Sequence, residues 1–581
     1  MAAHSHCVGM SYDQAMRGLN ILLDLLCSMS LVSVALAPAV GKAGKVPGGD
    51  PPFPRLAMWH PSYDRNTIPE CAAYDTVVGN FQDPLPGNAT KTFAEALRAA
   101  NPKIELLTYF TSSVIRHSAL YGGTRKTNPF IKDWPARWFL TEPGTALAEA
   151  VDARSEAIPL AQWEQRGPNK RGENVKWVIF RRDYDVLCDG EIMVVTALDP
   201  TAKTITVKRG MNGTRAKAHP AGARIAPILR FWAGSYIMNL TEDCPKAKLH
   251  GARADENWAE YSFRMSKRGS APWFWFTGGD QDGFLFDLMA DTITWTFFAD
   301  TRGIDIDQDN KPDPLAGLDT KWLTGIKDVT AMFEKTFPGA IIIRNNSRCR
   351  RFADYNGENF IGFPDTQWEK WDIDGRRGMT KYWHRFFFGN DREEVGGIQE
   401  YVKNSRPPVR TIVETTDIET DLDFAGHPEV LDPERWMLYK PDFKKMRWGL
   451  TSALVAGAYY CWVIHTDGHG QLGLFWFDEY DAGGKQRGYL GGPVADMNQL
   501  VADKLGSQWG CWGREFEGGF VICNPLDRGV EVKLPPGKWQ RIEGHQVPEV
   551  NSGAFEEGQV KVPAYDGLIL LRAKGGSEGT S

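Results

Sequence analysis

The sequence predicts an α/β fold, a (β/α)8 TIM barrel with an inserted small β-module and a C-terminal β-sandwich. From residue 55 onwards, short apolar runs of strand type alternate with helical stretches, as expected for parallel strands joined by helical crossovers. Eight such runs occur, and the third and fourth are separated by far more than a βα loop, so a further unit is inserted there. The region after the eighth run consists of strand-like segments and Gly/Pro turns, which favours a terminal β-sandwich.

The eight apolar runs lie at residues 56–59, 76–78, 104–110, 284–287, 340–344, 359–363, 409–414 and 458–464. Because 581 residues are too many for one ordinary core, several domains are expected. We predict a signal-like segment and linker at 1–54 and a barrel at 55–490 that is interrupted by the β-module at 180–228. The remainder, 491–581, is expected to hold a helix at about 494–505 and then the β-sandwich.

The inserted module is predicted from alternating strands between residues 190 and 228, with turns at Asp199-Pro200 and Asn212-Gly213. Its run RGMNGTRAKAHPAG, residues 209–222, resembles a segment that recurs in phage tail proteins and in β-modules of bacterial surface proteins.

The N-terminal region resembles a secretory signal peptide. An apolar run at 21–39 follows Arg17 and ends in small residues, although Asp24 interrupts it. We therefore expect a secreted or cell-surface protein whose mature chain has no stable membrane span. A membrane anchor is the alternative, because the run is nearly long enough to cross a bilayer.

Composition narrows the class of partner. The net charge of −6 and the lack of a long Lys/Arg run argue against nucleic acid. The 21 Trp, 30 Phe and 17 Tyr residues favour a carbohydrate partner, since aromatic rings stack on sugars, but many of them must fill cores. The nine cysteines show no CxxC motif and no paired Cys/His spacing, so buried thiols are expected rather than a zinc site. Cys511 and Cys523 could form a disulfide in an oxidising compartment.

Three carboxylates are the catalytic candidates, because active sites of such barrels lie at the C-terminal ends of the strands. Asp287 ends the fourth run, Glu414 ends the seventh, and Asp365 follows the sixth. Cleavage of a glycosidic bond needs two carboxyl groups, one that protonates the leaving oxygen and one that attacks or activates water. Asp287 and Glu414 meet that need, while Asp365, and less favourably Glu358, compete for the second role. A helix cap is the structural alternative for Asp287.

Further side chains near the same strand ends are predicted to contact substrate: Trp59, His60, Asp291, Trp462, His465, Asp478 and Glu479. His465, Asp467 and His469 could instead hold a metal, but a Gly-containing loop favours ordinary hydrogen bonding.

A structural calcium ion is predicted at Asp305, Asp307, Asp309 and Asp313, which place acids at alternate positions as a calcium loop does. Asn310 stands at the position of the usual Gly, and Ala316 stands at the position of the bidentate Glu of an EF-hand. Full EF-hand geometry is therefore excluded. A solvated acidic turn is the alternative. No cofactor is required for the chemistry.

Five segments together carry a family resemblance: FLFDLMAD, DIDQDNKPD, AIIIRNNS, NGENFIGFPD and FWFDEYDAGGKQRGYLGGPV. In these segments the chain, from about Arg55 to its end, resembles a group of uncharacterised bacterial proteins classed as hypothetical glycosyl hydrolases with TIM-barrel domains. The resemblance implies a barrel and a polysaccharide-directed hydrolase, but no residue roles. That group's pattern has an acid just before the Phe-Pro pair, where this chain has Gly362. This difference weakens the case for a catalytic residue on the sixth strand.

The sequence thus predicts a glycoside hydrolase acting on an oligo- or polysaccharide. Two alternatives stay open: a non-catalytic carbohydrate-binding or surface-structural barrel, and a phage tail-associated depolymerase.

Overall fold

The structure is a computed structural model. It describes residues 49–573 except for 60–66, 80, 82–83, 86–87, 122–123, 169–172, 232, 250, 268–280, 294–301, 364–377, 392–393, 419–434, 436–437, 465–472 and 504–505. The signal-like segment lies outside these residues, so export stays a prediction. Within the described part of the chain, no helix combines the length and apolar character needed to cross a membrane.

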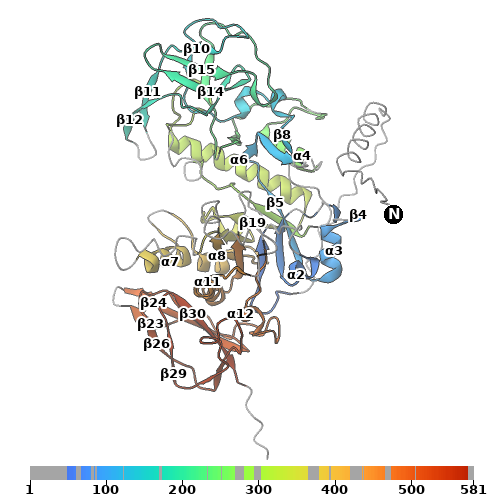
Figure 1. Ribbon diagram of the computed structural model, residues 1–581, viewed down its shortest axis with the longest axis vertical. Coiled ribbons are helices and arrows are strands. Elements are labelled where there is room, and N and C mark those ends of the chain that lie inside the picture. Colours follow the sequence, from blue (N-terminus) through green and yellow to red (C-terminus); the bar gives the residue numbers. More distant parts are fainter. Residues whose placement is uncertain are drawn as a thin grey trace, which may run out of the picture. The chain divides into compact units, whose positions relative to one another are not determined.

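The centre of the fold is an eight-stranded sheet in which each strand runs parallel to its neighbours. In sheet order the strands are β1 (Ala57–Trp59), β2 (Thr76–Gly79), β5 (Glu105–Phe110), β18 (Gly283–Phe286), β19 (Ile341–Asn345), β20 (Gly357–Phe360), β21 (Ile412–Ile418) and β22 (Tyr459–Ile464). Leu56 forms a parallel bridge to Tyr460, so the last strand meets the first and the sheet closes. The predicted TIM barrel is confirmed, with all eight apolar runs as its strands. Figure 1 labels two of these strands, β5 and β19.

Alternation along these strands sends one set of side chains into the barrel and the other towards the helices. The interior set forms one apolar cluster that includes Trp59, Leu107, Tyr109, Leu285 and Ile343. The helices outside are α2 (Ile68–Ala72), α3 (Phe93–Ala100), α4 (Trp258–Lys267), α6 (Leu315–Thr336), α7 (Gly378–Phe388), α8 (Ile398–Asn404), α11 (Phe443–Ala456) and α12 (Asp478–Asp481).

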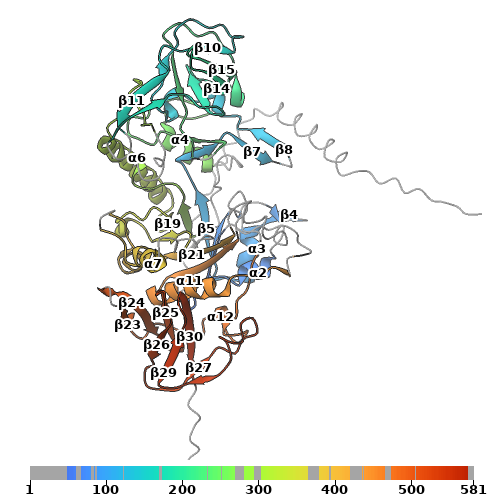
Figure 2. The ribbon, with the colours of Figure 1, turned by 60° about the vertical axis from the view of Figure 1, so that its left-hand side comes forward.

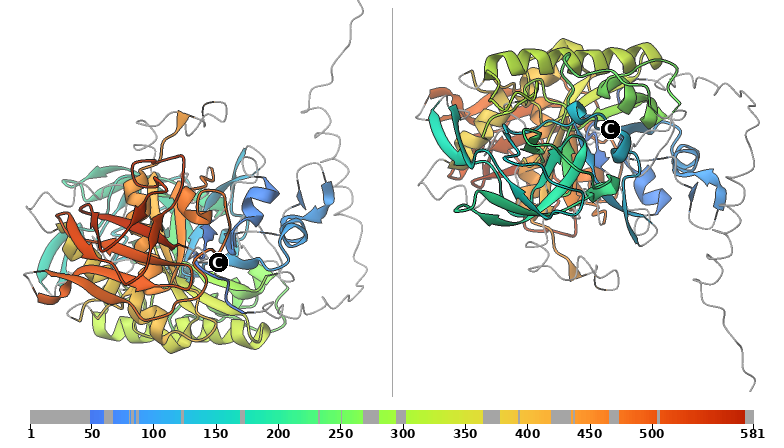
Figure 3. Two further views of the ribbon diagram at one scale, coloured as in Figure 1. Left: turned by 90° about the horizontal axis from the view of Figure 1, so that it is seen from below. Right: turned by 90° about the horizontal axis from the view of Figure 1, so that it is seen from above.

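Local sequence fixes where several of these helices begin and end. Thr67 and Thr92 start α2 and α3, each in a capping box with the Glu three residues later. Gly457, at φ 88°, ends α11 in the left-handed conformation that glycine accepts without strain. The long helix α6, at one edge of both end views in Figure 3, sets Phe333 against Phe284 and Phe286 of β18.

The inserted module between β5 and β18 is a six-stranded antiparallel sheet. Its strands, in sheet order, are β10 (Ala157–Pro159), β15 (Thr204–Lys208), β14 (Glu191–Asp199), β13 (Asp185–Cys188), β16 (Arg224–Pro227) and β9 (Thr145–Ala146). The predicted start at residue 180 was wrong, because the sheet already includes β9. β9 and β10 could not be recognised in the sequence, because strands of two and three residues are too short to show alternation.

Further short elements precede the C-terminal sheets: β3 (Pro84–Leu85), β4 (Asn88–Thr92), β6 (Val114–Arg116), β7 (Ser118–Tyr121), β8 (Thr124–Thr127), β11 (Glu164–Pro168), β12 (Asn174–Val178), β17 (Ser235–Ile237), and single 3-10 turns at Ile131–Asp133, Ala136–Trp138, Met211–Gly213 and Phe352–Asp354.

The C-terminal part is all-β. One sheet contains β23 (Asn498–Asp503), β24 (Gly506–Glu515), β25 (Gly519–Asn524), β30 (Asp566–Arg572), β27 (Trp539–Arg541) and β28 (Phe555–Glu556), and a two-stranded sheet contains β26 (Val530–Lys533) and β29 (Gln559–Val562). β25 and β30 pack on α11, and Figure 2 shows this contact.

Two expectations for this region were wrong. The predicted helix at 494–505 contains strand β23, whose backbone pairs with β24; the helix-like spacing of Met497, Leu500 and Val501 was misleading. Cys511 and Cys523 are free thiols on opposite faces of the sheet. The register explains this, because the residue opposite Cys523 is Trp512, one position along from Cys511.

Candidate active site

A hydrogen-bonded line of polar side chains runs across five neighbouring barrel strands, from β5 to β21. Asp287 directly follows β18 and is 6% exposed. The Tyr109 hydroxyl donates to its Oδ2 at 2.5 Å, and the Asn345 amide donates to its Oδ1 at 2.6 Å. Each carboxylate oxygen of Asp287 therefore has its own donor, one from β5 and one from β19.

The same line continues to Glu414 on β21, which is 1% exposed. The Asn359 amide of β20 donates to Glu414 Oε2 at 2.6 Å and to Asn345 Oδ1 at 2.9 Å. Asn345 and Asn359 are register partners in the sheet, so this contact follows from strand pairing. Two of the predicted catalytic carboxylates are thus brought into one site and joined through two amides.

Strand alternation explains why these side chains point to the same side. Successive residues of a strand face opposite sides, so a residue two positions after an inward-facing one also faces inward. Asn345 follows Ile343, and Glu414 follows Ile412, and both isoleucines belong to the interior cluster. Sequence reasoning missed Tyr109, Asn345 and Asn359, although the alternation within their strands could have identified them.

The donors to Asp287 are neutral. Burial, and then the charge of Asp287, raise the pKa of Tyr109 well above its usual value, so its hydroxyl keeps its proton at neutral pH. Trp59 lies edge-on to Tyr109 with ring centroids 6.1 Å apart, which places this predicted substrate residue beside the site. Tyr109 therefore contacts Asp287 through its hydroxyl and Trp59 through its ring.

Asp291, four residues after Asp287 in the chain, is held by guanidinium groups. Arg344 and Arg351 approach its Oδ1 at 2.9 and 3.1 Å, and its side chain is one of those lining a cavity of about 530 Å³. Glu358 points away from the barrel interior, 3.5 Å from Arg344 Nε, and accepts hydrogen bonds from Ser347. Glu358 is therefore structural and not the second catalytic acid.

Three predicted substrate contacts have structural roles instead. Trp462 lies on the outward face of β22, packed on Phe477 in the core between barrel and helices. Asp478 accepts backbone N–H groups of His545 and Gln546, and Glu479 accepts the amide of Asn551. The prediction for Trp462 failed because a residue next to an inward position points outward. Both acids instead join α12 to the connection between β27 and β28.

His60, Asp365 and His465 lie outside the described residues, as do Asp467 and His469. Their assigned roles stay predictions.

The acidic loop brings carboxylate oxygens of Asp305, Asp307 and Asp313 within 4.8 Å of one another. Arg224 also pairs with Asp305 at 2.5 Å, and burial raises the pKa of Asp305. Asp309 pairs with Lys311 on the surface. The loop offers the oxygen ligands that calcium prefers, with one arginine already beside it, and calcium binding stays a prediction.

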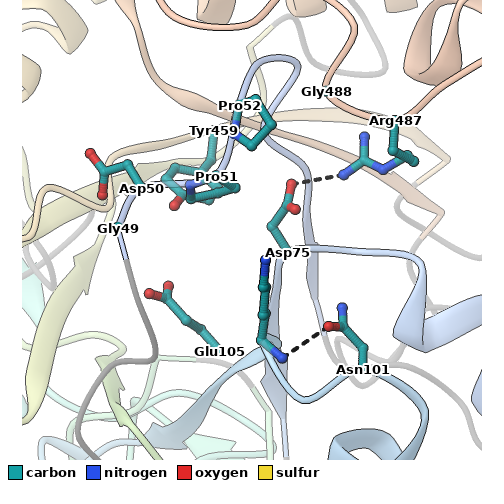
Figure 4. A pocket seen from close by; sticks show the side chains of 11 residues that line it. Gly49, Asp50, Pro51, Pro52, Asp75, Asn101, Glu105, Tyr459, Arg487 and Gly488 are labelled. Carbon is teal, nitrogen blue, oxygen red and sulfur yellow. Dashed lines mark hydrogen bonds and ion pairs between the residues drawn. The ribbon is translucent and has the colours of Figure 1, made fainter.

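The opposite end of the barrel holds a pocket of about 240 Å³, drawn in Figure 4. Its lining includes Asp75, Glu105 and Tyr459, which lie at the amino ends of β2, β5 and β22, and Arg487 from the segment after α12. Arg487 pairs with Asp75 at 2.8 Å, and Arg410 binds Glu105 through two hydrogen bonds of 2.5 and 2.6 Å. In this fold, polar groups at the amino ends serve stability, so this pocket is not the active-site candidate.

No protein-family model and no curated protein matches the chain. Solved structures that resemble it include an α-amylase from Geobacillus thermoleovorans complexed with acarbose, at 9% identity and a TM-score of 0.35, covering 90% of this chain and 99% of that one. A maltogenic α-amylase from Thermotoga neapolitana matches at 10% identity and a TM-score of 0.36, covering 90% and 99%. An Anoxybacillus α-amylase matches at 10% identity and a TM-score of 0.37, covering 90% of this chain and 98% of that one. At these TM-scores the similarity does not identify site residues. The barrel is instead assigned from the order and parallel pairing of its strands.

Proposed function

We propose that the protein is a glycoside hydrolase that cleaves an oligo- or polysaccharide with Asp287 and Glu414. The observation that supports this most strongly is the line of three side-chain hydrogen bonds, 2.6–2.9 Å long, that runs from Asp287 through Asn345 and Asn359 to Glu414. Glycoside cleavage needs two carboxyl groups at a fixed separation, and a rigid line of amides between two buried carboxyls supplies that.

In this proposal Asp287 is the ionised carboxylate. Its two oxygens accept from Tyr109 and Asn345, and donors of this kind stabilise negative charge. The carboxylate faces the positive charge that develops on the sugar ring in the transition state.

Glu414 is then the proton donor. It passes its proton to the glycosidic oxygen as the bond to the anomeric carbon breaks, and it recovers a proton from the water whose hydroxyl joins that carbon. Asn359 donates to one oxygen of Glu414 and so holds the carboxyl group in its orientation.

The test is release of new reducing ends from a panel of α- and β-linked polysaccharides by the full chain. We expect cleavage of at least one substrate class, and loss of that cleavage in the Asp287→Asn/Glu414→Gln double variant. A panel that is bound but not cleaved would favour the non-catalytic carbohydrate-binding barrel.

A further inference from the structure

We propose that the inserted β-module binds one zinc ion through Cys188, Asp189 and His219. The thiol sulfur, a carboxylate oxygen and a ring nitrogen of these residues all lie within 4.8 Å of one another. His219 Nδ1 and Asp189 Oδ2 are 3.1 Å apart. Bonds of about 2.0–2.3 Å to zinc place neighbouring ligand atoms roughly 3.3–3.7 Å apart, so small side-chain rotations complete the site.

The backbone brings the three residues together. Cys188 ends β13, and Asp189 and Gly190, at φ 47° and 82°, form the two-residue turn into β14. His219 arrives from a distant segment, which two backbone hydrogen bonds of 2.9 Å fix to Val151. The ligand positions are therefore set by the fold of the module and not by a loop that must first become ordered.

A carboxylate behind the histidine orients its ring. Glu191 Oε2 lies 2.9 Å from His219 Nε2, and the side chain of Glu191 is fully buried. When Nε2–H donates to Glu191, Nδ1 is left to bind a metal, which is the usual arrangement behind metal-ligating histidines. Arg209 holds both oxygens of Glu191 at 2.8 Å, so this carboxylate is itself fixed.

The donor set selects the ion. A thiolate and an imidazole favour zinc over calcium or magnesium, which prefer all-oxygen sites such as the acidic loop. Cys188 is a free thiol, and the Asp189 side chain is 46% exposed, so solvent reaches the site and can supply a fourth ligand. On binding, the S–H proton of Cys188 leaves to solvent as the Zn–S bond forms, and the unprotonated Nδ1 of His219 donates its lone pair to the Zn–N bond, with no change of oxidation state.

The experiment uses the full chain, without a histidine tag, treated with chelator and dialysed. It is titrated with zinc chloride, and separately with cobalt(II), which reports a thiolate ligand by its charge-transfer absorption. We expect one zinc per chain and a thiolate band with cobalt. Cys188→Ser should abolish that band and weaken zinc binding at least about 100-fold.

Asp189→Asn provides a milder variant, because asparagine also accepts the left-handed turn position; it should weaken zinc binding about tenfold while the module stays folded. The matched controls, Cys349→Ser and Asp307→Asn, should bind zinc as the parent does. The proposal is overturned if the parent retains no zinc at micromolar concentration, if cobalt binds without a thiolate band, or if Cys188→Ser and Asp189→Asn both bind like the parent.

Discussion

The two ends of the barrel both carry buried acids, but their partners differ. At the amino ends, Glu105 meets Arg410 and Asp75 meets Arg487. At the carboxyl ends, the contacts described for Asp287 come from a phenol and an amide. A guanidinium neutralises the acid beside it, whereas neutral donors orient an acid and leave its negative charge for a ligand.

The difference indicates which acids serve folding and which serve chemistry. A carboxylate paired with arginine is stabilised in the ground state and gains little from a cationic transition state. A carboxylate held by neutral donors interacts more strongly as positive charge develops, and only such differential binding accelerates a reaction. Substitutions at the two ends should therefore separate stability from turnover.

The largest expected effect on stability is at the amino ends. Arg410→Met leaves Glu105 buried without its cation, and loss of one partner of a buried ion pair costs about 3–5 kcal/mol. Urea unfolding measures this loss. Turnover per folded molecule should stay within about twofold of the parent; a large fall in turnover with unchanged stability would break the comparison.

A smaller effect is expected from the amide line. Asn359→Ala removes the donor that orients Glu414, so turnover should fall about 10- to 100-fold, which corresponds to roughly 1.4–2.7 kcal/mol. The matched control is Asn356→Ala, just before the same strand, where the side chain accepts from the Ile342 amide. The control should lose stability and keep its turnover; equal turnover losses in both would argue against a special role for Asn359.

Calcium should add a smaller increment through the acidic loop. If Asp305, Asp307 and Asp313 bind calcium only in the folded state, millimolar calcium should raise Tm by a few degrees, and Asp307→Asn should remove the rise. Turnover should not depend on calcium beyond this gain in stability. An unchanged Tm would instead favour an acidic turn that Arg224 neutralises.

The smallest expected effect is a pH dependence of stability that arises from His384. Burial lowers the pKa of His384, which stacks on Trp509 at 4.8 Å. The unfolded chain therefore binds this proton more readily, so its contribution to stability is present above about pH 6.5 and is lost as the pH falls. The free energy of unfolding, measured with urea, should fall between about pH 7.5 and 5.5, and it should fall less in His384→Gln. The same decline in parent and variant would contradict this assignment.

The sequence predicted the barrel well because eight apolar runs of suitable length could be located without knowledge of their partners. Asp287 and Glu414 were predictable because each ends an apolar run in the sequence, although β21 continues to Ile418 beyond Glu414. Trp462 was not, because its inward or outward direction depends on the register of a strand whose start the sequence leaves uncertain. Asn345 and Asn359 were missed because asparagines are common in turns, and only strand pairing shows that they meet. Cys188 and His219 are far apart in sequence, so no spacing indicated a metal site.

The most direct test of the account compares Asp287→Asn with Asp75→Asn on a substrate that the parent cleaves. Both changes remove one carboxylate charge and keep the side chain's shape, at opposite ends of the barrel; Asp287 is buried and Asp75 is partly buried. We expect Asp287→Asn to lower turnover at least about 10³-fold, roughly 4 kcal/mol, with urea unfolding nearly unchanged, and Asp75→Asn to alter stability with turnover close to that of the parent. Near-parental turnover by Asp287→Asn would contradict the proposed site, and a loss caused instead by Asp365→Asn would place the chemistry on the sixth strand.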